Sequence, residues 1–478
     1  MSETASQRLH RVTSYNPDID WDAPHDDPLA VADFTGTDIE TLPWFYKRYE
    51  DDLPRIELPR ELPPTTASAI EVLAGARVSA SAPDLAQLGR LLYLSGGIVR
   101  TTKRDWGTAY FRAAGSAGGR FPMELYVAVP PGSSLPAGVH WYHPLDHVLV
   151  TIGAPPRGGA PTIVTTGVPW RTGWRYRERG YRHIYWDSGT MLSQLLAAAD
   201  SAGLGADLYT SFPDARVTEL VGADGIHEWP VAVVALGGAP ALEPAGPPAA
   251  SGAVDHGVRE LPLETHAQRA GDLEELGEPW GRGTPVDVPL TESPPVEQVV
   301  LRRSSQRRMD RTRGLSHDVA LTALRTALRG IDVRHFVVVH DVDGIDPGVY
   351  EWPNLATAIS SGDLRDELGR IAVGQGLAHD AAFVVIGAAD VSRLDDHQYR
   401  EAQLAAGIVE GRLHLAAYAL GAGASGMTFL DSEIPGLLGE PLHALLFTCV
   451  GVPEYRSKTG GPPGAPVEVS QVVPRFRD

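Results

Sequence analysis

An arginine-rich stretch is the part of this sequence best able to bind an anion. The segment LRRSSQRRMDR, residues 301–311, holds five arginines in eleven residues. A guanidinium group forms paired hydrogen bonds with the oxygens of one phosphate, which a lysine ammonium cannot reproduce. On its own, such a run is by default interpreted as a solvated basic helix start, so both interpretations stay open at this point.

A glycine-loosened turn is the second segment that could contact a ligand. SAGGRFPMELYVAV, residues 116–129, joins a serine and small residues to an apolar strand. Glycines let a backbone approach a flat ligand closely, because they carry no Cβ. We therefore expect this turn to lie against a ligand.

Three motifs that resemble known sites have structural explanations. His140, His143 and His147 are spaced like metal ligands, but we predict strand and turn there, where alternate side chains point apart. DVDGIDPGVYE, residues 341–351, begins like a calcium loop, yet its glycine comes two positions early and a proline interrupts it. GAGASG, residues 421–426, fits G-x-G-x-x-G but follows a predicted helix rather than a strand. We expect neither a metal site nor a Rossmann domain.

Composition limits the class of protein. A chain of 478 residues is long enough for two domains with separate cores. A net charge of −19 argues against nucleic acid or an anionic membrane as a partner, so an anionic cofactor would need a local basic patch. The single cysteine, Cys449, lies in an apolar run and is expected to be buried. No stretch approaches the ~20 apolar residues of a membrane span, and we expect a cytoplasmic protein.

Apolar spacing predicts the elements that position these segments. Residues 81–94 read as a capped amphipathic helix that leads directly into the glycine turn. The strand after that turn is expected to form a hairpin with LPAGVHWY, residues 135–142. Residues 175–206 predict one long helix closing on Gly-Leu-Gly, and VAVVALGG, residues 231–238, predicts a buried strand.

The remaining segments set the domain boundaries. Residues 1–75 are polar, acidic and proline-rich, with one apolar cluster at Trp44, Phe45 and Tyr46, and we interpret them as an arm that packs on another surface. Periodicity is lost after residue 238, which indicates a linker or surface excursion. The predicted organisation is an arm at 1–75, a first domain at 76–240, a linker at 241–295, a second domain at 296–458 and a tail at 459–478.

An internal repeat is the most informative feature of the chain. PGVYEW in the second half answers PAGVHWY in the first, and LLFTCVG answers VAVVALG. Four residue pairs share one offset of 218: Tyr181 with Tyr399, Gly189 with Gly407, Gly203 with Gly421, and Gly205 with Gly423. The repeat predicts two tandem copies of one α+β domain.

The turn, hairpin and helix in this order resemble the SagB/McbC-type dehydrogenases of the nitroreductase superfamily, flavoenzymes that oxidise azolines in ribosomally made peptides to azoles. The resemblance covers most of residues 85–240. It implies two nitroreductase-like domains, each an antiparallel-rich sheet flanked by helices, that pair as an intrachain pseudo-dimer. In the family each flavin lies between two subunits, with an arginine-rich segment at its phosphate and a serine-containing turn near its ring.

The resemblance implies one FMN site, because the arginine segment precedes only the second copy and the serine turn occurs only in the first. Gln306 stands where the family often has a cation, so one charged contact is expected to be missing. The residues that the resemblance places around FMN are Arg302, Arg303, Ser304, Gln306, Arg456 and Lys458 at the phosphate, and Ser116, Ala117, Gly119, Gly426, Met427 and Thr428 at the ring.

The resemblance also suggests catalytic residues. Peptide-oxidising members carry a Lys-Tyr pair in the segment equivalent to WRYRERGYR, where this sequence has Arg175 and Tyr176. Arginine stays protonated, so Arg175 cannot be a general base and could only stabilise a developing anion. Tyr176 is the better candidate for the proton, since an adjacent guanidinium favours phenolate. The alternative is that Tyr176 packs and Arg175 is a surface residue.

These observations favour an FMN-dependent dehydrogenase that oxidises thiazoline or oxazoline rings in a modified peptide during natural product biosynthesis, with flavin reoxidised by oxygen. Two alternatives are an NAD(P)H-dependent nitro or quinone reductase of the same fold, and a scaffold without flavin that recruits peptide or partner enzymes. The expected partners are the peptide and a cyclodehydratase, with no nucleic acid or membrane. The chain is expected to act as a monomeric pseudo-dimer or as a homodimer.

Overall fold

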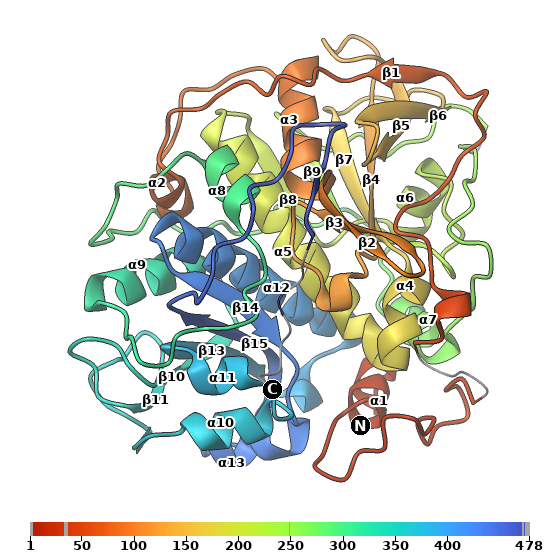
Figure 1. Cartoon of the computed structure of the whole chain (residues 1–478). Helices are drawn as coiled ribbons and strands as arrows, with labels where there is room; N and C mark the ends of the chain where they lie inside the picture. Colours follow the sequence, from red (N-terminus) through yellow and green to blue (C-terminus); the bar gives the residue numbers. More distant parts are fainter. Residues whose placement is uncertain (1–2, 33–36, 248, 471–472, 474–478) are drawn as a thin grey trace.

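Two antiparallel sheets lie on opposite sides of a central pair of helices, α5 (Gly180–Ser201) and α12 (Asp396–Ala419), in a computed structural model (Figure 1). The structure describes residues 3–32, 37–247, 249–470 and 473. Of the predicted tail, residues 471–472 and 474–478 lie outside the described residues.

The first sheet has the strand order β1-β6-β5-β4-β7-β9-β8, and all its pairings are antiparallel. Its strands are β1 (Arg55–Glu57), β4 (Met123–Val129), β5 (Gly138–His143), β6 (Val148–Gly153), β7 (Thr162–Gly167), β8 (Ala206–Tyr209) and β9 (Trp229–Leu236).

The second sheet has the order β12-β11-β10-β13-β15-β14, again antiparallel throughout. Its strands are β10 (Arg334–Val339), β11 (Gly348–Glu351), β12 (Ser360–Ser361), β13 (Phe383–Ala389), β14 (Gly423–Met427) and β15 (His443–Gly451).

The two sheets are copies of one arrangement. Without β1, the order β6-β5-β4-β7-β9-β8 corresponds strand for strand to β12-β11-β10-β13-β15-β14, and a central helix precedes β8 and β14. The predicted α+β fold with two tandem copies of one domain is therefore confirmed. The hairpin prediction for both copies is confirmed as well, because β4 pairs with β5 and β10 with β11. GAGASG lies at the start of β14 and follows a helix, as expected.

Alternate residues of the buried strands face different cores. In β4, Leu125 and Val127 belong to the core around the central helices, whereas Tyr126 and Ala128 belong to a second core on the opposite face of the sheet. This period of two is the pattern of a strand covered on both faces. Cys449 of β15 is buried, as predicted.

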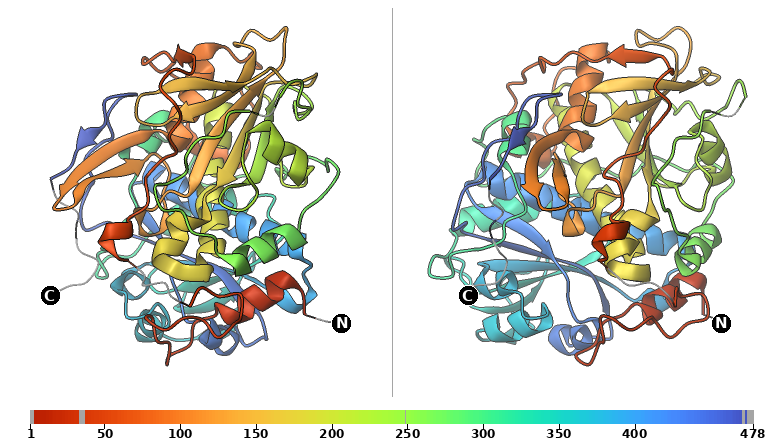
Figure 2. Two further views of the ribbon diagram at one scale, coloured as in Figure 1. Left: turned by 90° about the vertical axis from the view of Figure 1, so that its right-hand side faces the viewer. Right: turned by 45° about the vertical axis from the view of Figure 1, so that its right-hand side comes forward.

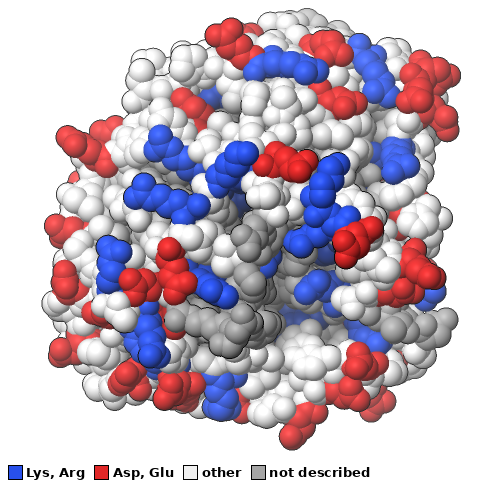
Figure 3. Space-filling model, in the orientation of Figure 1, with Lys and Arg blue, Asp and Glu red and all other residues white. Residues whose placement is uncertain are grey.

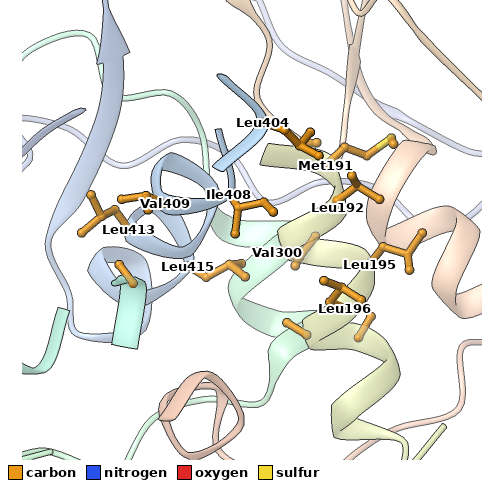
Figure 4. Close-up of a cluster of buried hydrophobic side chains, with 14 of the residues drawn as sticks. Met191, Leu192, Leu195, Leu196, Val300, Leu404, Ile408, Val409, Leu413 and Leu415 are labelled. Atoms are coloured by element: carbon orange, nitrogen blue, oxygen red, sulfur yellow. The ribbon is translucent and has the colours of Figure 1, made fainter. Parts of the chain in front are cut away.

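The two central helices meet at the glycine pair that the repeat aligns. A Cβ on Gly189 would lie 2.5 Å from the Leu404 carbonyl oxygen, and a Cβ on Gly407 would lie 2.4 Å from the Trp186 carbonyl oxygen. Only glycine permits so close a helix approach. Around this contact, leucine, isoleucine, valine and methionine side chains from α5 and α12 interlock with Val300 (Figure 4).

Shorter helices cover the sheets and the ends of the central pair. Asp84 caps α3 by accepting a hydrogen bond from the Gln87 N–H, which confirms the predicted capped helix. The helices are α1 (Ala5–Val12), α2 (Ala69–Ala74), α3 (Leu85–Gly96), α4 (Pro169–Tyr176), α6 (Asp214–Leu220), α7 (Pro262–Ala270), α8 (Val296–Arg302), α9 (His317–Ala327), α10 (Arg365–Ile371), α11 (Gly376–Asp380) and α13 (Ile434–Leu438). No helix in the described ranges is long and apolar enough to cross a membrane.

The N-terminal arm packs on both copies. Its helix α1 lies beside the second copy, where the Ser6 N–H donates to Asp396 Oδ1 (2.6 Å), and its strand β1 extends the first sheet (Figure 2). The segment 241–295 contains a helix, α7, which lies against α1 and α12.

Two predictions about connections are wrong. A hairpin of β2 (Ile98–Arg104) and β3 (Gly107–Arg112) separates α3 from the glycine turn, and the strand β16 (Val467–Glu468) from the C-terminal segment pairs with β2 in parallel. The predicted helix at 175–206 is divided, because Arg177 has φ +50° and the chain then turns into α5. The backbones of Gly173 and Gly180 pack together at that bend, a contact that apolar spacing does not reveal.

Candidate functional site

A cavity of about 610 Å³ lies where segments of both copies meet. The first copy contributes residues of the β2–β3 hairpin and of the segment 115–119, which we name the Ser116 turn. The second copy contributes residues 303–307 after α8 and 455–458 after β15, and the C-terminal segment covers one side. Figure 3, drawn in the orientation of Figure 1, shows Lys and Arg side chains around the hollow in the middle of the molecule.

The cavity is strongly cationic although the chain carries a net charge of −19. Two of these cations hydrogen-bond to backbone carbonyls rather than to carboxylates: Arg100 donates to the Leu301 and Lys458 carbonyls (2.6 Å each), and Arg303 donates to the Ala113 carbonyl (2.6 Å). Arg112, by contrast, pairs with Glu124 (3.7 Å). The described residues that line the cavity include seven cations, Arg100, Arg112, Arg175, Arg303, Arg307, Arg456 and Lys458, and one carboxylate, Glu468. Such a cavity favours an anionic ligand.

A buried carboxylate on α5, that of Asp187, fixes the Ser116 turn through hydrogen bonds. The Ser116 hydroxyl donates to Asp187 Oδ2 (2.5 Å), and the Ala117 N–H donates to Asp187 Oδ1 (2.9 Å). The Phe121 N–H donates in turn to Ser116 Oγ (2.7 Å). Asp187 thereby fixes the shape of the turn relative to the central helix.

A second carboxylate, that of the half-buried Glu410 of α12, lies beneath the arginine segment. It accepts a hydrogen bond from the Gly426 N–H (3.0 Å), and His414 Nε2 lies 3.7 Å from its Oε1. His414 Nδ1 lies 3.4 Å from Arg303 Nη1, whose guanidinium also donates to the Ala113 carbonyl (2.6 Å). Burial raises the pKa of Glu410 to about 7 and holds the pKa of His414 well below its usual range.

Asp187 should make stability depend on pH. Burial, and to a lesser degree the charge of Glu410, raises the Asp187 pKa to about 8 against the donors from Ser116 and Ala117. Because its unfolded pKa is near 4, the folded chain binds one more proton than the unfolded chain between about pH 4 and pH 8, so stability falls as pH rises through this window. We expect Asp187→Asn to remove a slope of up to about 1.4 kcal/mol per pH unit there.

Urea unfolding at several pH values would measure this slope, with the exposed Asp105→Asn variant as the control. Glu410 titrates in part of the same window, so the quantity to compare is the difference between parent and variant. An unchanged slope in Asp187→Asn would show that Asp187 is ionised throughout.

Several residues predicted for the site lie in the cavity wall, and others do not. Arg302 ends α8 and is exposed outside the wall. Gln306 is buried and donates to the Arg308 carbonyl (2.8 Å) instead. The predicted residues that line the cavity are Ser116, Gly119, Arg175, Arg303, Ser304, Arg456 and Lys458, and those outside its lining are Arg302, Gln306, Ala117, Tyr176, Gly426, Met427 and Thr428.

The predicted catalytic pair lies against the Ser116 turn. A Cβ on Gly118, which has φ +59°, would lie 2.6 Å from Arg175 Cδ and 2.7 Å from the Tyr176 hydroxyl oxygen. The Tyr176 ring stacks on His183 with centroids 4.0 Å apart. Glycine at this position therefore lets α4 bring both side chains over the turn.

Sequence reasoning missed the two carboxylates. Asp187 and Glu410 each stand within an almost wholly buried helix, and a lone acid among apolar residues is a usable signal, since such acids are rarely buried without partners. The histidines weighed as metal ligands bond within the protein instead: His140 contacts Thr151 (3.0 Å) and His147 contacts Tyr142 (2.9 Å). The described ranges contain no group of three or more metal-ligating side chains.

In the other half of the duplicated fold, the position that corresponds to the cavity, here named the symmetry-related position, is filled by the chain itself. The Gln306 N–H donates to the Ala424 carbonyl of β14, and the equivalent carbonyl on β8, that of Ala206, accepts from Arg282 (3.2 Å). Behind Arg282 the backbones of Gly283 and Gly330 touch, because a Cβ on Gly330 would lie 2.4 Å from Gly283 N. Residues of the predicted linker thus occupy the position that corresponds, in the other half of the duplicated fold, to the cavity.

Comparisons with known proteins agree with the duplicated α+β fold and give it a nitroreductase-like character. Residues 150–238 match the Nitroreductase family. A protein of Methanocaldococcus jannaschii named "Putative nitroreductase MJ1384" is 26% identical over 168 residues, which covers 32% of this chain and 80% of that protein.

Solved structures extend the likeness over the chain. The crystal structure of a protein from Anabaena variabilis, described as a putative nitroreductase, has a TM-score of 0.72 and 22% identity and covers 95% of this chain and 100% of that one. The E. coli microcin synthetase McbBCD complex with truncated pro-MccB17 bound has a TM-score of only 0.27 and 20% identity, covering 37% of this chain and 70% of that one. The first likeness establishes the fold of the whole two-copy chain, and the second carries no argument about function.

Proposed function

We propose that this chain is an FMN-dependent oxidoreductase with one flavin site, in the cavity between the two copies, and that it oxidises azoline rings of a modified peptide to azoles. The observation that carries the proposal is that the cavity takes four of its seven described cations from the second copy and its glycine turn from the first. An intrachain pseudo-dimer therefore supplies both halves of one site without a second chain.

The residues of the cavity fit FMN. Its phosphate carries about two negative charges and suits the second-copy cations Arg303, Arg307, Arg456 and Lys458. Hydroxyl groups stand beside them, since Ser457 donates to Ser304 Oγ (2.6 Å). In the Ser116 turn nothing lies within 4 Å of a Cβ built on Gly119, so the backbone there is open to a flat ring.

The bound flavin would supply a hydride acceptor, and the chain would supply the group that takes the proton. Oxidation of an azoline removes a hydride and a proton from neighbouring atoms of the ring. Tyr176 is the candidate for the proton because its hydroxyl lies over Gly118 of the Ser116 turn. The choice of an azoline rests on the order of turn, hairpin and helix and on the place of the Arg175–Tyr176 pair in the sequence.

Purified protein provides the test. We expect a flavin absorbance spectrum, FMN as the released chromophore, and one FMN per chain, because residues 277–283 and Gly330 close the symmetry-related position. Incubation with an azoline-containing peptide should remove two hydrogen atoms from the ring, measured by mass spectrometry.

Other outcomes point elsewhere. Steady NAD(P)H oxidation with a nitro or quinone acceptor, and no azole, would indicate a reductase of the same fold. Protein without flavin, and unable to bind added FMN, would indicate a scaffold. Two FMN per chain would contradict the single site.

A further inference from the structure

Three further guanidinium groups, those of Arg120, Arg171 and Arg175, lie near the Ser116 turn and belong to the first copy. Arg120 donates to the Arg171 and Pro43 carbonyls (3.3 and 3.1 Å), and Arg171 pairs with Glu124 (2.6 Å). Burial, and then the charges of Arg171 and Arg175, lowers the pKa of Arg120 to about 10. Positive charge is therefore in excess at this end of the cavity.

Arg175 is the member of this group that reaches the cavity. Its aliphatic stem lies on Gly118, where any side chain would collide with it, and its guanidinium lies 5.9 Å from the Tyr176 ring centroid. The residue is exposed and lines the cavity, and within the described part of the chain it makes no hydrogen bond or ion pair. The contact with Gly118 therefore positions the aliphatic stem of Arg175, while its guanidinium can bind a ligand.

The phosphate of FMN does not need Arg175. Four cations of the second copy already line the cavity, against about two negative charges of the phosphate. Arg175 comes instead from α4 of the first copy and stands at the turn proposed to face the flavin ring, where a substrate would bind. A guanidinium there can pair with both oxygens of a carboxylate.

We infer that Arg175 binds a carboxylate of the substrate, so that the enzyme selects anionic substrates. This inference rests on the proposed function, since it places the substrate over the flavin. In a peptide the carboxylate is either an acidic side chain near the ring or the C-terminus. Arg175 is then a binding residue for the substrate, and Tyr176 beside it remains the candidate for the proton.

Titration of FMN-loaded protein with benzoate and with its neutral isostere benzamide tests the inference through the absorbance of the bound flavin. We expect benzoate to bind at least tenfold more tightly and to lose affinity as KCl is added, whereas benzamide does not. Arg175→Gln should remove the preference and Arg175→Lys should keep part of it. Arg104→Gln, an exposed position on the β2–β3 hairpin, is the matched control and should behave like the parent.

Equal affinity for the two probes, or unchanged benzoate binding in Arg175→Gln, would overturn the inference while leaving the flavin site intact. If the protein binds no flavin, the proposed function fails, and calorimetric titration of benzoate into the parent and Arg175→Gln still tests the carboxylate site. Azoline peptides with an amidated C-terminus, or with Gln in place of Glu, would then distinguish the two sources of the carboxylate.

Discussion

Flavin-loaded Tyr176→Phe protein should form azoles ~10² to 10⁴ times more slowly than the parent, which is the usual contribution of a positioned acid–base group. The substitution removes one hydroxyl, and this hydroxyl lies against Gly118 of the Ser116 turn. The stacking of the ring on His183 does not require it, so the local packing should persist. Azole formation is measured by mass spectrometry at matched flavin content.

The partly exposed Tyr110→Phe variant on β3 serves as the control, because Tyr110 does not line the cavity. Arg175→Lys should retain more activity than Arg175→Ala, since the lysine keeps the positive charge. Parental rates in flavin-loaded Tyr176→Phe would show that the proton leaves by another route and that Tyr176 only packs.

Loss of cations at the phosphate end should weaken FMN binding about tenfold to a hundredfold for each residue, since a charge-assisted contact contributes roughly 1.5 to 3 kcal/mol. We expect this for Arg303→Ala and for Arg456→Ala, both of which line the cavity. The neighbouring Arg302→Ala should bind FMN like the parent, because Arg302 is exposed outside the wall. Fluorescence titration of FMN into flavin-free protein measures the three affinities.

Arg303 also donates to the Ala113 carbonyl, so its removal could act through the fold. Thermal unfolding of each variant separates weaker FMN binding from a loss of stability. Arg456→Ala tests the phosphate contact independently of the hydrogen bond between Arg303 and Ala113. Should Arg302→Ala lose FMN while Arg303→Ala and Arg456→Ala keep it, the phosphate lies on the outer side of α8.

The sequence by itself determined the duplicated architecture. Apolar, β-branched runs mark the buried strands, and they recur in the same order in both halves, so the strand order of one copy repeats in the other. The aligned glycines Gly189 and Gly407 are the point where the central helices touch. The single-site proposal also began in the sequence, from an arginine segment and a serine turn that each occur once.

Only the tertiary structure decided which side chains meet. Arg302 and Arg303 are adjacent in the sequence, yet Arg302 is exposed and Arg303 is buried, because α8 ends at Arg302. Residues 277–283 have no periodicity and were expected to be linker, but they run along β8 and fill the symmetry-related position. Asp187 gains its role from Ser116, 71 residues away. Desolvation and hydrogen bonding depend on segments that are distant in sequence, so no local pattern could reveal these contacts.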